Sequence, residues 1–315
     1  MKQKVSRLVI LLLVILLIPC GITYLLSGKG SKSRGTRNNS ICISIEENGV
    51  DKEYSLNTYI MMAMAADIPV TYELEALKAQ STIIRTYVYV IAEKKKTNSL
   101  AAVDIGLQYK SLDVARSSWG GENAESYEKK LSKAIDDTNN MVITYNDDLI
   151  IPLFHPVSIG MTRSSKQAIG EDIAYLTSVE SKGDVQSTDY LKISSIPKET
   201  VVRQMEKFYP DCNVSADSLE DEIVVEKRDE DGYIKTIRIG NETITGDQFA
   251  SLFDMNSTNF YIETFEDSLR FICKGKGHGL GLSQYGANFK ALQGSKYDEI
   301  LEYYFTGTQV KEYIQ

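Results

Sequence analysis

The chain has 315 residues, of which 43% are apolar and 25% charged, a balance typical of a globular protein with one large domain or two small ones. Seven of the 35 Lys and Arg residues and none of the 43 Asp and Glu residues lie in the first 38 positions, so the remainder carries 28 basic against 43 acidic groups, a net charge of −15. Phosphate binding needs a basic surface, so this composition argues against a nucleic-acid partner.

The first 40 residues divide into three parts. Residues 8–26 are an uncharged apolar run, about 28 Å long as a helix at about 1.5 Å per residue, enough to cross the hydrocarbon core of a membrane. We expect residues 1–7 to be a cytoplasmic tail, residues 8–26 a transmembrane anchor, and residues 27–40, rich in Gly, Ser, Lys and Arg, a linker to an extracytoplasmic domain at 41–315. A cleaved signal peptide is the alternative, although no small-residue cleavage site follows the run.

The first half of the domain mixes short strands with helices. Alternating isoleucines from Ile41, the hairpin signal Asn48-Gly49 and the residues near Tyr54 predict two strands. Apolar residues at helical spacing predict helices at 56–66, 73–95 and 127–137, the first ending ahead of Pro69. A looser stretch surrounds the only Trp, and two strands follow at 141–145 and 149–154.

The second half predicts one helix after Pro197, a β-meander at 223–226 and 233–239, a short helix near 248–253 and strands at 260–263 and 269–273. The expected fold class is therefore α+β: an N-terminal transmembrane helix, then a mixed helix and antiparallel-sheet ectodomain with a substrate cleft.

Residues 275–287, GKGHGLGLSQYGA, follow an expected strand and open a helix at Ser283. Four alternating glycines allow positive φ and let a ligand approach the backbone and the N–H groups of the helix start. No G-x-G-x-x-G register fits, so a dinucleotide is not expected. A tight turn without a ligand is the alternative interpretation.

The chain contains two histidines, His155 and His278, so an all-His metal site cannot be assembled, and we expect no metal and no cofactor. A Ser–His–Asp hydrolase built on Ser158 or Ser283 is disfavoured, because neither serine lies in a G-x-S-x-G elbow.

Several motifs occur in an order shared with one family. Residues 65–69 (AADIP), 72–80 (YELEALKAQ) and 85–87 (RTY) are similar to its signature (A/S)-E-M-P, (F/Y)-E-x-E-A-L-K-A-Q and R-T-(F/Y). Trp119-Gly120, the segments 154–162 and 178–181, and the Gly-rich segment also match. From Tyr54 to Gly307 the chain thus resembles the stage II sporulation protein D (SpoIID/LytB) family.

The resemblance implies a peptidoglycan lytic transglycosylase that cleaves glycan strands already stripped of stem peptides during engulfment in sporulation. The partners it implies are these strands, a sporulation amidase and other proteins of the engulfment complex. It also implies a single-pass protein of the mother-cell membrane that faces the septum. The reaction needs one carboxyl group, which protonates the glycosidic oxygen and then takes the proton of the muramic 6-hydroxyl; a second carboxylate is unnecessary.

The resemblance assigns the acid/base role to Asp67. Lys78 and Arg85, seven residues apart on one helix face, are expected to hold the lactyl carboxylates of the glycan, because an acidic domain must concentrate positive charge to do so. Capping of carbonyls or pairing with acids is their alternative role. The substrate contacts expected in full are Lys78, Arg85, His155, Lys276, His278, Ser283, Gln284 and Tyr285.

Three departures separate the chain from the family pattern. The family has Glu where Asp67 stands, and one methylene fewer sets the carboxyl back by about 1.5 Å, while an error near 1 Å can cost about a hundredfold in rate. Ile159 replaces a residue that is commonly Gly or small and polar. Some relatives bind zinc through His and Cys between the catalytic helix and the Trp segment, but this chain has neither residue type from Ile43 to Phe154. A binding or scaffolding paralogue without catalysis is therefore the rival hypothesis.

Overall fold

A computed structural model describes residues 41–47 and 49–313. Its elements form three hydrophobic clusters of buried side chains. Within the described residues no helix is both long and apolar enough to span a bilayer. The predicted tail, anchor and linker at 1–7, 8–26 and 27–40 lie outside the described residues.

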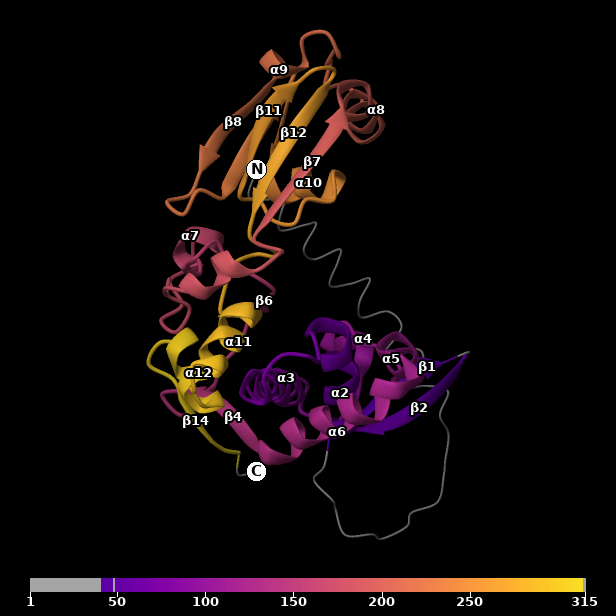
Figure 1. Cartoon of the computed structure of the whole chain (residues 1–315), viewed down its shortest axis with the longest axis vertical. Helices are drawn as coiled ribbons and strands as arrows, with labels where there is room; N and C mark the ends of the chain where they lie inside the picture. Colours follow the sequence, from indigo (N-terminus) through magenta and orange to yellow (C-terminus); the bar gives the residue numbers. More distant parts are fainter. Residues whose placement is uncertain (1–40, 48, 314–315) are drawn as a thin grey trace. The chain divides into compact units, whose positions relative to one another are not determined.

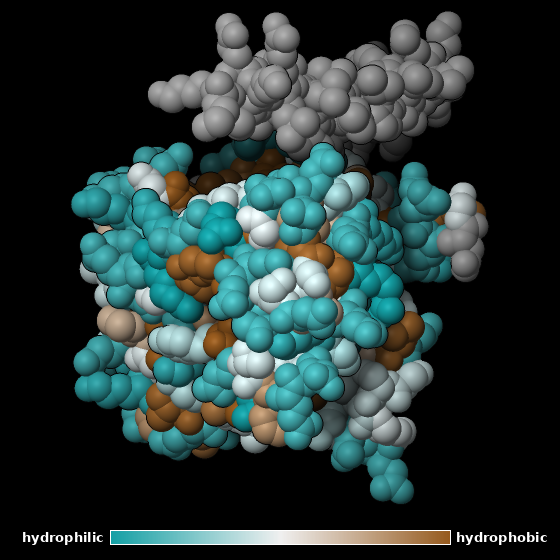
Figure 2. Space-filling view, turned by 90° about the horizontal axis from the view of Figure 1, so that it is seen from above, coloured by the Kyte–Doolittle hydropathy of each residue, from teal (hydrophilic) through white to brown (hydrophobic). Residues whose placement is uncertain are grey.

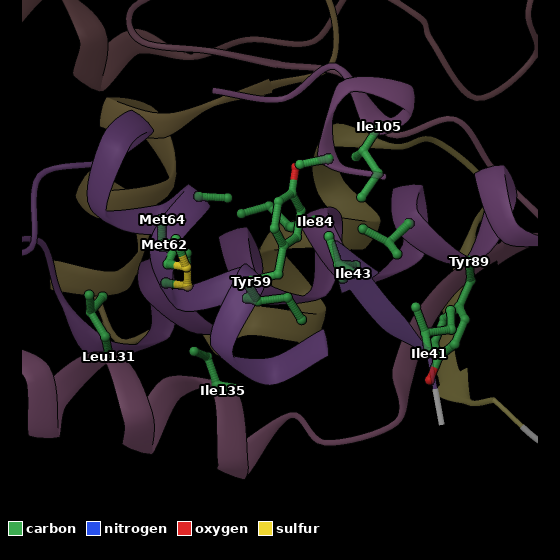
Figure 3. Packing of buried hydrophobic residues seen from close by; sticks show 14 of the residues in the cluster. Ile41, Ile43, Tyr59, Met62, Met64, Ile84, Tyr89, Ile105, Leu131 and Ile135 are labelled. Carbon is green, nitrogen blue, oxygen red and sulfur yellow. The ribbon is translucent and has the colours of Figure 1, made fainter. Parts of the chain in front are cut away.

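The first cluster packs helices against a small sheet. Strand β1 pairs antiparallel with β2 and parallel with β3, and Ile43 and Ile45 on β1 point into the core. Figure 3 shows Tyr59, Met62, Ile84, Leu131 and other side chains of this core converging. The elements are β1 (Cys42–Glu47), β2 (Val50–Ser55), α2 (Leu56–Asp67), α3 (Leu74–Lys95), β3 (Ser99–Ala101), α4 (Ala102–Ile105), α5 (Leu112–Trp119) and α6 (Gly121–Asp137).

The second cluster lies between three-stranded antiparallel sheets and short helices. The sheets have the strand orders β10-β9-β8 and β11-β12-β7, and their strands run side by side in the upper part of Figure 1. The elements are β7 (Leu191–Pro197), α8 (Lys198–Phe208), α9 (Leu219–Glu222), β8 (Ile223–Arg228), β9 (Ile234–Ile239), β10 (Glu242–Thr245), α10 (Gly246–Leu252), β11 (Phe260–Phe265) and β12 (Ser268–Lys274).

The third cluster joins the start of α3 to the last elements of the chain. Strand β4 lies between β14 and β5, and β13 pairs in parallel with β6. The elements are β4 (Met141–Tyr145), β5 (Asp148–Leu149), β6 (Phe154–His155), α7 (Ser165–Ile169), the 3₁₀ helix η1 (Lys182–Gln186), β13 (Leu282–Ser283), α11 (Gln284–Leu292), α12 (Tyr297–Tyr304) and β14 (Gln309–Glu312).

The predicted α+β class with antiparallel sheets is confirmed, but two local predictions were wrong. The expected strand at 149–154 is broken: β5 covers only Asp148–Leu149, while Phe154–His155 pairs with Leu282–Ser283, far along the chain. The stretch before Trp119 is helical rather than loose, because the Ser111 side chain caps α5 by accepting the N–H of Val114. On the face shown in Figure 2, apolar side chains are interspersed with polar ones.

Candidate active site

Asp67 is the last residue of α2, immediately before the turn that leads to α3. The helix ends there because Pro69 disfavours helical geometry at Ile68, which is extended with φ −125° and ψ 137°. The Asp67 carboxylate accepts no hydrogen bond from a described residue. Burial raises its pKa to about 6, and the charge of Lys110 lowers it by less. The position of Asp67 at a helix C-terminus also disfavours a negative charge.

Aromatic side chains surround this carboxyl group on one side. Asp67 lines a cavity of about 480 Å³ together with Trp119 from the end of α5 and Tyr127 from α6. The two rings meet edge to face, with centroids 6.1 Å apart. Tyr72 lines the same cavity, and burial raises its pKa to about 12, so its hydroxyl remains a donor. Flat apolar rings beside a half-buried acid suit a pyranose ring.

The opposite wall comes from segments more than eighty residues further along the chain. Pro156, Val157, Asp189, Lys276 and Gln284 line it. Lys276 Nζ and Asp189 Oδ2 lie 2.9 Å apart in an ion pair that is about half exposed. The backbones of Val157 and Lys276 exchange two hydrogen bonds, which fixes the position of the lysine. The cavity thus offers a ligand the acid Asp67, the Lys276–Asp189 ion pair and the side-chain amide of Gln284.

The turn after Asp67 is held by polar contacts from other elements. Lys130 on α6 donates from its Nζ to the carbonyl oxygens of Val70 and Tyr72, at 3.1 and 2.5 Å. The Asn288 side chain accepts the N–H of Glu73 at 2.7 Å. Because α6 also carries Tyr127, one helix positions both the turn and part of the aromatic wall.

Comparison with known proteins shows which family the first part of the domain matches. Residues 46–145, which include Asp67, Trp119 and Tyr127, match the family model described as "Stage II sporulation protein". These residues are a domain of the stage II sporulation protein family. The chain is 29% identical over 295 residues to stage II sporulation protein D of Bacillus subtilis, covering 91% of this chain and 83% of that protein.

The chain is also similar to two further proteins. Stage II sporulation protein D of Bacillus amyloliquefaciens is 28% identical over 265 residues, covering 82% of this chain and 74% of that protein. The protein named amidase enhancer from Bacillus subtilis is 23% identical over 295 residues, covering 78% of this chain but 39% of its own length. The sequence similarity thus continues well beyond residue 145.

The structure brings three of the predicted site residues together. Asp67, Lys276 and Gln284 all line the cavity. Gln284 is buried, and its Nε2 donates to Gln80 Oε1 at 3.3 Å. Tyr285 packs edge to face against Tyr72, with centroids 6.2 Å apart, and so supports the cavity wall from behind.

The structure places Arg85 and Lys78 elsewhere, which corrects the expected lactyl-binding pair. Arg85 is 1% exposed and donates to the carbonyl oxygens of Thr138 and Ile135 at 2.7 and 3.2 Å, so it caps the end of α6. Burial lowers its pKa to about 10. Lys78 is paired with Glu75 at 2.9 Å and Asp137 at 3.0 Å. Neither cation lines the cavity, so the alternative role holds in the structure.

Both histidines also lie away from the Asp67 cavity. His155 is buried, its Nδ1 is 3.0 Å from the Leu280 carbonyl oxygen, and burial together with His278 lowers its pKa to about 3. His278 lines a separate, mainly apolar cavity of about 260 Å³ with Tyr87 and Leu153. A direct glycan contact by either histidine at Asp67 therefore has no support in the geometry.

The Gly-rich segment has the predicted backbone but packs against protein. Gly275, Gly277, Gly279 and Gly281 have φ values of 71°, 95°, 80° and 70°. A Cβ at Gly279 would lie 2.6 Å from Tyr233 Oη, and one at Gly277 would lie 2.9 Å from the Cβ of His155. These glycines accommodate neighbouring protein atoms, so only the flanking Lys276 and Gln284 reach the cavity.

The serines do not form a hydrolase triad. Ser283 caps α11, its Oγ accepting the N–H of Gly286 at 3.3 Å. Ser158 Oγ accepts the N–H of Gly160, and its own N–H donates to the buried Asp184 at 2.8 Å. Among the described residues no hydrogen bond links either serine to a histidine.

The cavity residues that were not among the expected site residues include Lys110, Tyr127 and Asp189. Lys110 is exposed, and its N–H donates to the Met62 carbonyl oxygen, which places it near α2. Only Tyr127 had a usable signal, since it is an aromatic residue near the only Trp of the chain. Across residues 41–47 and 49–313, no group of three His, Cys, Asp or Glu side chains could hold a metal ion.

Proposed function

We propose that this protein is a peptidoglycan lytic transglycosylase that acts on peptide-stripped glycan strands, with Asp67 as its single acid/base. The observation that carries the proposal is the half-buried Asp67 carboxyl group, which faces a cavity of about 480 Å³ and has a pKa raised to about 6. At pH 7 roughly one such group in ten is protonated, compared with about one in a thousand for an ordinary Asp. A general acid needs that protonated fraction.

The reaction then uses one carboxyl group twice, first as an acid and then as a base. Protonated Asp67 donates to the glycosidic oxygen as the bond from C1 of the muramic residue breaks and the leaving sugar departs. The resulting carboxylate accepts the proton of the muramic 6-hydroxyl, whose oxygen bonds to C1 and closes the 1,6-anhydro ring. No water is consumed, and Asp67 ends protonated as it began. Trp119, Tyr127 and Tyr72 are positioned to hold sugar rings and exclude water.

The setting of this activity is proposed from the family. Stage II sporulation proteins and a relative named amidase enhancer support a role in sporulation beside an amidase that strips the strands. The apolar run at 8–26 supports an anchored protein with its domain outside the cell membrane. Membrane fractionation of sporulating cells, with protease accessibility of residues 41–315 in protoplasts, tests this location.

One observation favours a second candidate, a strand-binding protein without catalysis. Asp67 carries a shorter side chain than the family's Glu and accepts no hydrogen bond from a described residue that would aim it. The cavity, the rings and the Lys276 pair would serve binding equally well.

Incubation of the purified protein with peptide-free glycan strands, followed by mass spectrometry of anhydromuramyl products, separates the two candidates. If Asp67 is the acid/base, Asp67→Asn abolishes release and Asp67→Glu retains or raises it. The wild-type rate should fall about tenfold per pH unit above about 6, as Asp67 loses its proton. Equal inactivity of wild type and Asp67→Asn, with binding preserved, establishes the binding protein instead. Glu73 and Glu75 do not line the cavity, so they would not replace Asp67.

A further inference from the structure

The sheet β11-β12-β7 has an outward face that is unusually apolar. Direct cross-strand partners point to the same side of an antiparallel sheet, and the register pairs Tyr261 with Ile272 and Ile272 with Ile193. Residues two apart on each strand extend the same face. This outer sheet face comprises Leu191, Ile193, Ser195, Pro197, Tyr261, Glu263, Phe265, Ser268, Arg270, Ile272 and Lys274, and most of its apolar residues gather at the end of the sheet that carries Leu191, Ile193 and Tyr261.

The opposite face of the same sheet is already buried. Phe260, Leu269, Phe271 and Cys273 on that side belong to the second core. An antiparallel sheet with one buried face normally presents polar residues on the other. Here the outer face exposes Ile193 at 57% and Tyr261, Phe265 and Leu191 at 46% each. Apolar groups gathered in this way mark a binding surface rather than chance exposure.

The cations of this face, Arg270 and Lys274, outnumber its one carboxylate, Glu263, which lies opposite Arg270. Arg270 lies over the Phe265 ring at 4.1 Å, and Lys274 lies 5.3 Å from the Tyr261 ring centroid. Neither side chain forms an ion pair with an acid of the described chain. The domain as a whole is acidic, with 28 basic against 43 acidic groups after residue 38. The sign of the charge is therefore locally reversed on this face.

The two aromatic–cation pairs repeat along the sheet. Tyr261 and Phe265 are four residues apart on β11, and Arg270 and Lys274 are four apart on β12. Four residues of a strand span about 13 Å. A ligand that fits both pairs is an extended polymer with apolar ring faces and an anionic group repeated at a similar interval. Glycan strands that carry a lactyl carboxylate on every second sugar have this chemistry.

We infer that the outer sheet face is a second glycan-strand surface, separate from the Asp67 cavity, which holds long peptide-free strands by stacking and by charge. The inference rests on the proposed substrate class, but it does not depend on catalysis by Asp67. Binding at this face raises the local concentration of strand at the enzyme without changing the chemistry at the cavity.

The test uses the full-length protein and two matched variants. Tyr261→Ser combined with Arg270→Gln alters the outer sheet face, and Phe208→Ser combined with Lys207→Gln alters an aromatic–cation pair on α8 whose ring is 52% exposed. Co-sedimentation with insoluble peptide-free strands gives the apparent Kd, and a soluble short muramyl oligosaccharide probes the cavity alone. Circular dichroism melting establishes that both variants fold.

Weakening of strand binding by about tenfold or more in the first variant, with unchanged binding of the short oligosaccharide and an unchanged α8 variant, supports the inference. Strand binding by the wild type should also weaken with added salt more than binding by the first variant, because the variant lacks one charge contact. Wild-type sedimentation in the first variant overturns the inference. Asp67→Asn distinguishes the two proposals. If this variant releases no product but still sediments with strands, the result bears on the proposed reaction and not on the outer sheet face.

Discussion

Ionisation of Asp67 is less favourable in the folded protein than in the unfolded chain, so the free energy of unfolding depends on pH. Its pKa rises from 3.8 in the unfolded chain to about 6 in the fold. Between these values the folded state binds more protons than the unfolded state, so the free energy of unfolding decreases as pH rises from about 4 to about 6 and stays lower above.

We expect Asp67→Asn to remove this penalty. The full shift corresponds to about 3 kcal/mol, and partial exposure of the group reduces the expected gain at pH 7.5 to about 1–2 kcal/mol. At pH 4 or below, the variant and the wild type should have equal stability. Urea unfolding at the two pH values measures this difference. A gain of the same size at both would mean that the amide makes a new contact instead.

Arg85 is a buried structural cation, whereas Lys78 belongs to a partly exposed ion pair. Arg85→Ala leaves the carbonyl oxygens of Ile135 and Thr138 unpaired in the core, so we expect a loss of about 3 kcal/mol or more. Lys78→Ala removes a partly exposed pair with Glu75 and Asp137 and should cost about 1 kcal/mol or less. Denaturant unfolding checks both values, and glycan affinity measured on folded protein should not change. A stable Arg85→Ala protein with weaker affinity would contradict this assignment.

The sequence could not reveal this difference between the two residues. Helical periodicity correctly placed Lys78 and Arg85 on one side of α3 beside the apolar stripe. Whether a cation at that edge is buried depends on what packs over it, and the carbonyl groups that surround Arg85 come from the end of α6, about fifty residues away. By contrast, the place of Asp67 at the end of α2 was predictable from local chemistry, a helix stopped by Pro69, whereas its role comes only from the family resemblance.

At the scale of elements, the Gly-rich segment packs so closely against its neighbours that a side chain there should destabilise the fold. A matched pair of glycine variants can measure this effect. Gly279 and Gly294 both have positive φ, 80° and 96°, but only a Cβ at Gly279 meets a neighbour, Tyr233 Oη at 2.6 Å. Gly294→Ala should therefore cost about 1 kcal/mol from backbone strain alone. Gly279→Ala should cost about 1–3 kcal/mol more. Thermal unfolding measures both, and equal losses would show that contact with Tyr233 is unimportant.

The helices were predicted better than the short strands, for a local reason. Helices α2 and α3 begin and end within about one residue of their predicted bounds, since Ser55 and Pro69 define the limits of α2. The two-residue strands β6 and β13 could not be predicted, because each is defined only by the other and they are separated by more than a hundred residues. The apolar residues near Phe154 therefore suggested one continuous strand, which the structure interrupts.

At the scale of the whole described domain, one buried ion pair links the Gly-rich segment to the β8–β9 hairpin. Arg163 donates two hydrogen bonds to Asp229 Oδ2, at 2.9 and 2.6 Å, and one to the carbonyl oxygen of His278 at 3.3 Å. Its guanidinium carbon lies 4.2 Å from the Tyr233 ring centroid. This pair could not be predicted from the sequence, because the partners are 66 residues apart and neither belongs to a motif.

We expect Asp229→Asn to lower the free energy of unfolding by about 3 kcal/mol, because it leaves the Arg163 charge buried without a counter-ion. Amide hydrogen exchange should accelerate at Arg163, whose N–H donates to the Gly279 carbonyl oxygen, and at Lys276. The surface pair Lys129–Glu125 provides a control, since Glu125→Gln should change neither measurement appreciably. Unchanged exchange at Lys276 would show that the ion pair does not help to hold the cavity wall.

The division of the cavity between distant segments sets an order of events during biosynthesis. Asp67, Trp119 and Tyr127 belong to the first half of the chain, while Lys276 and Gln284 come from the second. A chain synthesised from its amino end therefore contains Asp67 long before the segments that carry Lys276 and Gln284 exist. The growing polypeptide cannot bind a strand between the two sides of the cavity until residue 284 has been synthesised and has packed against the first half of the domain. Under the proposed function, an incomplete chain therefore cannot cleave a glycan strand, and no inhibitor is needed to prevent it.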